Sequence, residues 1–151
     1  MFIHEPNHHT CFVITTIFTL ALTACDDGRS TDDETGSETG DEMSLEIVGT
    51  YTDNFGDTHT ISETEWSNSA GSFAISQFSN EEMWLVAQNA ETNMYDPGSW
   101  SRFDWTWDAE QLYYCQSLFD GATIDDALAA ASADTADLAM GCGGFPWSQL
   151  Q

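Results

Sequence analysis

The side chains of widest chemical use in this 151-residue sequence are four cysteines and four histidines. Three histidines lie near the N-terminus: His4, His8 and His9. The fourth, His59, is alone in the rest of the chain, and Cys115 and Cys142 form no CxxC pair, so a zinc site is disfavoured. No GxSxG elbow, HExxH pair, P-loop or dinucleotide-binding motif occurs. We therefore predict no metal, no cofactor and no enzymatic activity.

An apolar run leads to the cysteine at position 25. Residues 11–24 hold ten apolar side chains and four threonines. Because a membrane-spanning helix needs about 20 apolar residues, this run is too short to span a bilayer, but it fits the apolar segment of a secretory signal. The residues that end it, Leu22, Thr23, Ala24 and Cys25, resemble the lipobox of bacterial lipoproteins.

This resemblance implies that the signal is cleaved before Cys25, that diacylglycerol is attached to the Cys25 thiol, and usually that the new amino group is acylated. The chain would then be exported and anchored by lipid in the bacterial cell envelope, at the inner or the outer membrane. A buried N-terminal strand or helix and an uncleaved signal anchor are the alternatives. On the lipoprotein interpretation, the three N-terminal histidines leave with the signal and bind no metal.

The segment after the cysteine has nothing to bury. Residues 26–42 comprise eight acids, one arginine and otherwise only glycine, serine and threonine, a composition typical of disordered chain. The sequence therefore divides into a removed signal (residues 1–24), a lipidated cysteine with an acidic tether (residues 25–42) and one folded domain (residues 43–151).

Charge excludes one class of partner. The chain has 26 acids against two bases, Arg29 and Arg102, and its formal net charge is −24. Nucleic-acid binding depends on basic side chains that neutralise phosphates, so we exclude it. The same imbalance disfavours attraction to anionic lipid headgroups, so lipid on Cys25, and not charge, would hold the protein at a membrane.

The two remaining cysteines form an even pair. With Cys11 removed in the signal and Cys25 lipidated, Cys115 and Cys142 are left in an oxidising compartment. A disulfide between them is predicted. A metal site or a free catalytic thiol are the weaker alternatives, because no ligand or histidine lies at suitable spacing.

Alternation and turn residues predict β-strands from residue 46 onward. The strands at residues 46–52 and 58–62 flank the sequence DNFGD (residues 53–57). Its acids resemble the start of a calcium loop, but the twelfth residue, Thr64, is not glutamate, so a hairpin turn is favoured. Further strands are expected at residues 72–78, 83–89, 100–108 and 111–119.

The strand at residues 100–108 alternates most clearly. Phe103, Trp105 and Trp107 would face the core. The residues between them are polar and would face water: Arg102, Asp104, Thr106 and Asp108. About six strands at short intervals predict a mostly β or α+β domain, in which a small antiparallel meander curls into a barrel or sandwich.

One C-terminal helix is expected after the last strand. Residues 123–140 are alanine-rich, with Thr123 as N-cap and Asp126 three positions later. Glycines end the helix, and the disulfide would tie its end to the strand that carries Cys115. Phe145 and Trp147 would then close one end of the core.

Aromatic residues supply the candidate ligand contacts. Sixteen of them lie in residues 43–151, and rings combined with acids and amides suit sugar binding, although core packing is the commoner use. Trp66, Tyr95 and Trp100 are expected near loops. Arg102, the only base of the domain, forms a surface ion pair or binds an anion. We expect an envelope protein that binds or scaffolds other envelope components, with a glycan- or small-molecule-binding module as the alternative and an enzyme third.

We predict that the mature protein begins at Cys25 and carries lipid there. Its intact mass should exceed the mass calculated for residues 25–151 by that of the attached acyl groups. A Cys25→Ser variant, which lacks the acceptor thiol, should keep its signal and gain no lipid. An N-terminus at Met1, or an unmodified Cys25, would contradict the anchoring hypothesis.

Overall fold

The structure, a computed structural model, describes residues 44–151. The signal, Cys25, the three N-terminal histidines and the acidic tether lie outside the described residues. No helix within residues 44–151 combines the length and hydropathy needed to cross a bilayer.

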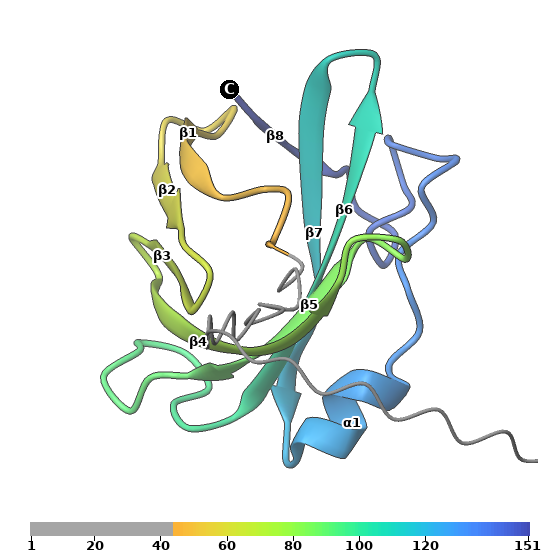
Figure 1. The fold of residues 1–151 in the computed structure, drawn as a ribbon. Coiled ribbons are helices and arrows are strands. Elements are labelled where there is room, and N and C mark those ends of the chain that lie inside the picture. The colour runs from red at the N-terminus through yellow and green to blue at the C-terminus, as the bar shows by residue number, and fades with distance from the viewer. Residues whose placement is uncertain (1–43) are drawn as a thin grey trace, which may run out of the picture. The chain divides into compact units, whose positions relative to one another are not determined.

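The described residues form eight β-strands and one short helix (Figure 1). The elements in chain order are β1 (Gly49–Thr52), β2 (Thr58–Ile61), β3 (Glu65–Asn68), β4 (Gly71–Ser79), β5 (Trp84–Asn89), β6 (Trp100–Asp108), β7 (Gln111–Gly121), α1 (Ile124–Ala129) and β8 (Ser148–Leu150). Each strand pairs antiparallel with the next, so the sheet is a meander, and it curls into a nearly closed barrel. The predicted fold class is confirmed. Eight strands replace the expected six, and the two that were not predicted are β3 and β8, with four and three residues.

Closure of the barrel depends on β8. This strand pairs with residues 112–114 of β7 on one side and contacts the chain just after β1 on the other. The N–H of Thr52 donates to the carbonyl of Gln151 at 2.8 Å, and the N–H of Gln151 donates back at 2.9 Å. The Asp53 turn also behaves as predicted, because its carboxylate accepts from the N–H groups of Phe55 and Asp57 and so folds the β1–β2 hairpin.

The barrel interior is apolar over most of its length. Trp66 stacks on Phe103 with ring centroids 4.7 Å apart, and Phe103 meets Phe73 edge to face. Phe103 and Trp105 point inward as predicted. Trp107 follows on the same face but is not part of the buried core, because it is 44% exposed. The reason is that β5 begins at Trp84, which pairs with Asp104, so the end of β6 extends beyond its neighbour.

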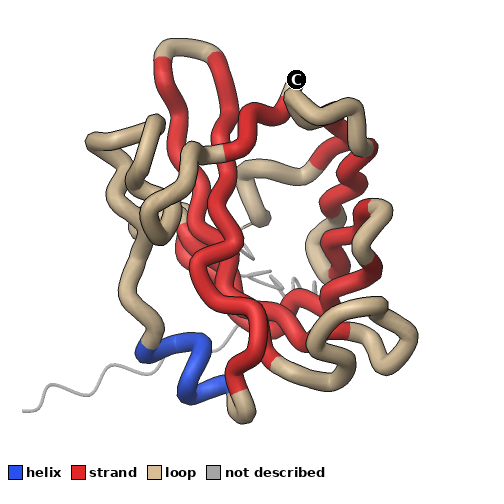
Figure 2. The backbone as a smooth tube through the Cα atoms, turned by 180° about the vertical axis from the view of Figure 1, so that it is seen from behind, coloured by secondary structure: helices blue, strands red, loops and turns tan. Residues whose placement is uncertain are grey.

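The outer face of β6 is covered, contrary to the prediction that its polar residues face water. Arg102, Asp104 and Thr106 are buried, and only Asp108 is exposed. Helix α1 contacts β5, β6 and β7, and the loop that follows it runs along the outside of the sheet (Figure 2). Alternation along a strand therefore predicted the two faces correctly but not that both would be buried.

The predicted helix is much shorter than residues 123–140. Its start is confirmed, because Thr123 and Asp126 form a capping box. It ends at Ala129, and Ala130 is already extended. Helix propensity is a weak preference that tertiary contacts override, and here the N–H of Ala133 donates to the buried carboxylate of Asp104.

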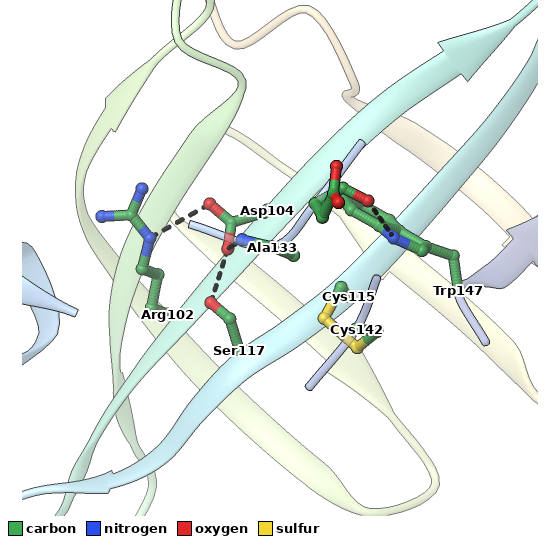
Figure 3. Close-up of a disulfide and its surroundings, with 8 residues drawn as sticks. Arg102, Asp104, Cys115, Ser117, Ala133, Cys142 and Trp147 are labelled. Carbon is green, nitrogen blue, oxygen red and sulfur yellow. Dashed lines mark hydrogen bonds and ion pairs between the residues drawn. A yellow bond between two sulfur atoms is a disulfide. The ribbon is translucent and has the colours of Figure 1, made fainter. Parts of the chain in front are cut away.

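The predicted disulfide is confirmed. Cys115 on β7 is bonded to Cys142 in the loop before β8, with Cα atoms 5.6 Å apart (Figure 3). The bond closes a loop with a sequence separation of 27. It fixes where the chain returns to the sheet and hence where β8 begins.

Replacing both cysteines, Cys115→Ser with Cys142→Ser, should lower the free energy of unfolding by up to about 3.5 kcal/mol, the chain-entropy value for a loop of this length. Urea denaturation of the variant and of the oxidised protein measures the difference. Equal midpoints for the two proteins would show that the disulfide contributes nothing to stability.

Candidate functional site

The most unusual surface feature is an unpaired edge of β7. Strand β8 covers only residues 112–114 of that edge. Beyond them β7 continues for seven residues toward α1, and no other strand of residues 44–151 pairs with it on that side (Figure 1). Alternate residues of such an edge direct their N–H and C=O groups outward, where they can pair with another strand.

A hollow of about 350 Å³, which we call the edge groove, follows this edge. It is lined by residues from β7 and from the segment around the disulfide: Tyr114, Cys115, Gln116, Ser117, Phe119, Cys142, Gly143, Phe145 and Ser148. The ring of Phe119 is 52% exposed and that of Phe145 is 71% exposed. The prediction that Phe145 closes the core is therefore wrong. Trp147 is buried, and its indole donates to the carbonyl of Asp134.

A second hollow of about 300 Å³, the mouth pocket, lies at one end of the barrel. It is lined by residues of two loops and three strands: Ala70, Phe73, Asn89, Asn93, Tyr95, Asp96, Gln116 and Phe119. Gln116 and Phe119 also line the edge groove, so the two hollows meet at the unpaired part of β7.

Buried amides build the wall of the mouth pocket. Gln116 Nε2 donates to Ser101 Oγ at 3.0 Å, and Ser101 Oγ donates to Asn89 Oδ1 at 2.6 Å. Asn89 Nδ2 then donates to the carbonyls of Asp96 at 2.9 Å and Phe119 at 3.1 Å. This chain of hydrogen bonds holds the loop between β5 and β6 against β7.

A second amide ties the same loop to β4. Asn93 accepts from the N–H of Ser72 and donates to its carbonyl, each at 2.9 Å. The contact is close enough that a Cβ on Gly71 would lie 2.1 Å from Asn93 Oδ1, so only glycine fits there. The loop is therefore fixed at two points.

Only one of the four predicted ligand contacts reaches a hollow. Tyr95 lies in the loop between β5 and β6, is 69% exposed and lines the mouth pocket. Trp100 is half-buried at the start of β6 and lines neither hollow. Trp66 lies in the short strand β3 and is not available to a ligand at the surface, because it is at 0% exposure inside the core. Residues 65–68 form a strand that the sequence pattern is too short to reveal.

Arg102 is bonded to other residues inside the protein and is not exposed to bind an anion. It is 4% exposed, and its Nε donates to Asp104 Oδ1 at 3.0 Å (Figure 3). Its Nη2 donates to Ser132 Oγ at 2.9 Å. The central carbon of the guanidinium lies 5.1 Å from the ring centroid of Trp84. The ion pair foreseen for Arg102 is thus present, but it is buried and not at the surface.

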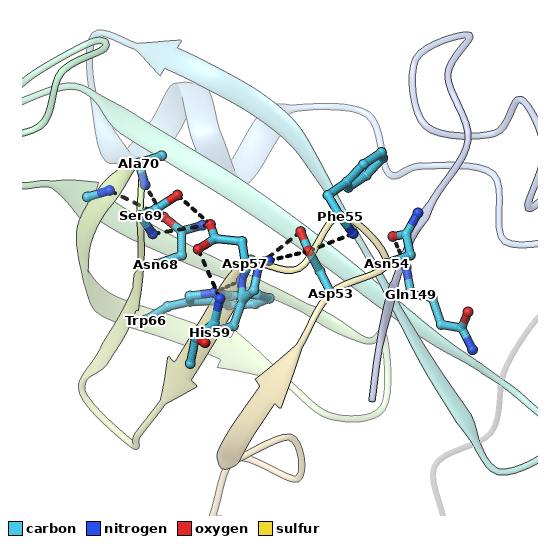
Figure 4. Close-up of polar contacts among 12 residues, drawn as sticks. Asp53, Asn54, Phe55, Asp57, His59, Trp66, Asn68, Ser69, Ala70 and Gln149 are labelled. Atoms are coloured by element: carbon cyan, nitrogen blue, oxygen red, sulfur yellow. Dashed lines mark hydrogen bonds and ion pairs between the residues drawn. The ribbon is translucent and has the colours of Figure 1, made fainter.

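His59 is sealed within the barrel (Figure 4). Trp66 Nε1 donates to His59 Nδ1 at 3.0 Å, so the ring proton belongs on Nε2, which lies 3.4 Å from Asp53 Oδ2. Both ring nitrogens are engaged. Tyr114 lies against the same ring with centroids 5.0 Å apart, and burial raises the pKa of Tyr114 to about 12, so its hydroxyl stays neutral at ordinary pH.

The domain that carries both hollows is acidic. Seventeen acids lie in residues 44–151, and the one base of that part, Arg102, is neutralised by Asp104. No three metal-binding side chains gather among these residues. Comparison of the chain with known protein families, curated proteins and solved structures gives no match. The site must therefore be interpreted from its own chemistry.

The substitution Arg102→Met should lower the free energy of unfolding by about 3 kcal/mol, because it leaves the carboxylate of Asp104 buried and unpaired. A matched double variant, Arg102→Met with Asp104→Asn, removes the charge but keeps an acceptor for Ala133. It should be more stable than the single variant in urea denaturation. A single variant as stable as the double would contradict this assignment.

Proposed function

We propose that this chain is a lipid-anchored envelope protein whose barrel binds an extended, basic segment of another envelope protein along β7. The ending of the apolar run at Leu22, Thr23, Ala24 and Cys25 supports the anchoring. The observation that carries the binding role is the unpaired edge of β7 with the edge groove beside it.

An extended segment fits this edge because a strand can be added to it. Addition of a peptide strand uses main-chain hydrogen bonds for affinity and side-chain pockets for specificity. The groove offers both faces of β7 to such a segment. Tyr114, which packs against the core, belongs to the inner face, and Cys115, bonded to the outer loop, belongs to the outer face. Successive side chains of the partner would alternate between these faces.

Charge favours a basic partner. An acidic surface without an unpaired base in residues 44–151 attracts lysine and arginine side chains and repels acidic chains. A second copy of the same chain is disfavoured on the same ground, because each copy is strongly negative. Exposed rings at Phe119 and Phe145 supply the apolar contacts that anchor such interfaces.

A binding role is preferred to catalysis because the groups that could transfer protons or attack a substrate are committed. His59 is enclosed and bonded at both nitrogens, Cys115 is in a disulfide, and the raised pKa of Tyr114 keeps its hydroxyl protonated. The edge groove thus has side chains and main-chain groups that can bind a partner, but no activated nucleophile or base.

The proposal predicts position-specific crosslinking in cells. A photo-reactive phenylalanine analogue at Phe119 or Phe145 of the full chain should capture one and the same partner. The matched control is the analogue at Trp107, an exposed aromatic position at the far end of β6. It should not capture that partner. Equal yields at all three positions would exclude the edge groove as the docking surface.

A peptide made from the captured segment should then bind the purified chain directly. Phe119→Ser or Phe145→Ser should weaken binding at least tenfold, whereas Trp107→Ser should leave it unchanged. Hydrogen exchange should slow at outward-facing amides of residues 115–120 in the complex, because a strand added there bonds them. Binding without that protection would contradict strand addition.

A further inference from the structure

We infer that the mouth pocket binds a small organic ammonium ion. The inference goes beyond the proposed protein-binding role, because it concerns a different hollow and a different class of ligand. Its basis is the combination of aromatic rings, unused hydrogen-bond acceptors and negative charge in one cavity.

Three aromatic rings from separate elements line the pocket. Phe73 of β4 is buried and forms part of the inner wall, whereas Tyr95 and Phe119 are exposed at the rim. The faces of such rings attract cations, and attraction to several rings recognises quaternary and primary ammonium groups. The volume of about 300 Å³ is at the small end of the range for ligand pockets.

The polar groups that remain free in the pocket favour a donor or a cation. The Asn89 amide uses both of its hydrogens and its oxygen within the protein, whereas Asn93 Nδ2 donates once, to the carbonyl of Ser72. Among the described residues, no partner engages the carboxylate of Asp96, the Oε1 of Gln116 or the hydroxyl of Tyr95. The first two are acceptors only. An ammonium ion would use the charge of the Asp96 carboxylate together with the acceptors and the ring faces, whereas a neutral sugar would make no use of that charge.

The backbone of Asp96, whose carboxylate would pair with the cation, is held in place. Asp96 has a left-handed backbone, with φ 47°, and its carbonyl accepts from Asn89 Nδ2 at 2.9 Å and from the N–H of Ser99 at 3.2 Å. Such bonds keep the loop in a conformation that costs energy for a residue other than glycine. The loop that carries Asp96 is therefore ordered before a ligand arrives, which reduces the backbone entropy lost on binding.

The surrounding charge adds to this preference. No base competes for Asp96, because Arg102, the one base in residues 44–151, is buried beside Asp104. A cation entering the pocket therefore meets attraction from the whole acidic domain as well as from the nearby carboxylate.

The test is calorimetric titration of the full chain with choline and with 3,3-dimethylbutan-1-ol, which has the same shape without the charge. Choline should bind at least tenfold more tightly than the alcohol. Equal affinities would identify a merely apolar pocket and overturn the inference. Stronger binding of glucose than of choline would also overturn the inference and would identify a sugar site. Absence of binding by choline, tetramethylammonium and putrescine would also overturn it.

Variants separate a built site from diffuse attraction. Asp96→Asn keeps the backbone conformation, which asparagine tolerates, and should weaken choline binding about tenfold, as should Tyr95→Ala. Glu110→Gln removes one exposed charge at the other end of β7 and should have no effect. If Glu110→Gln weakens binding as much as Asp96→Asn, only the net charge matters and the inference fails.

Two further controls are needed. One identifies the source of the ligand, and the other shows whether ligand binding and partner binding depend on each other. Titration with phosphatidylcholine vesicles distinguishes a lipid headgroup from a free ammonium compound, and binding of either carries the same chemistry. Phe145→Ser should leave choline binding unchanged, and Tyr95→Ala should leave crosslinking at Phe145 unchanged. Failure of the protein-binding proposal would thus be visible separately from failure of this one.

Discussion

Closure of the barrel by a three-residue strand is the constraint on which the surface of this protein depends. Because β8 reaches only from Ser148 to Leu150, it joins the start of β7 to the chain after β1 and leaves the rest of β7 unpaired. A longer β8 would have paired with that edge and filled the edge groove. The candidate site is thus a consequence of where the last strand begins.

The position at which β8 begins is set by an ion pair and a disulfide on the outer face of the sheet. The Arg102–Asp104 pair holds residues 132 and 133, and the Cys115–Cys142 disulfide holds the chain nearer to β8. Burying an ion pair costs desolvation energy, which its additional hydrogen bonds to Ser132, Ser117 and Ala133 offset. These bonds also explain why helix α1 ends at Ala129 although the alanine-rich sequence continues.

The sequence predicted what local chemistry determines. The β1–β2 turn, the Thr123 cap, the inward direction of Phe103 and Trp105 and the disulfide follow from neighbouring residues or from cysteine parity. The buried outer face of β6, the short β3 and the exposure of Phe145 do not, because each depends on which distant segment packs there. Tyr95 was expected near a loop because turn residues surround it, and it does lie in the loop between β5 and β6. Nothing in the sequence of their strand indicated that Gln116 and Phe119 would line a pocket.

The two hollows are joined by more than proximity. Gln116 lines both and, through Ser101 and Asn89, is bonded to the backbone of Asp96 on the mouth-pocket loop. A strand added along β7 would constrain Gln116 and Phe119, and so would a cation seated between Phe119 and Asp96. Tyr95 and Phe145 each line one hollow alone, so substitutions at these two residues change one site without removing a wall residue of the other.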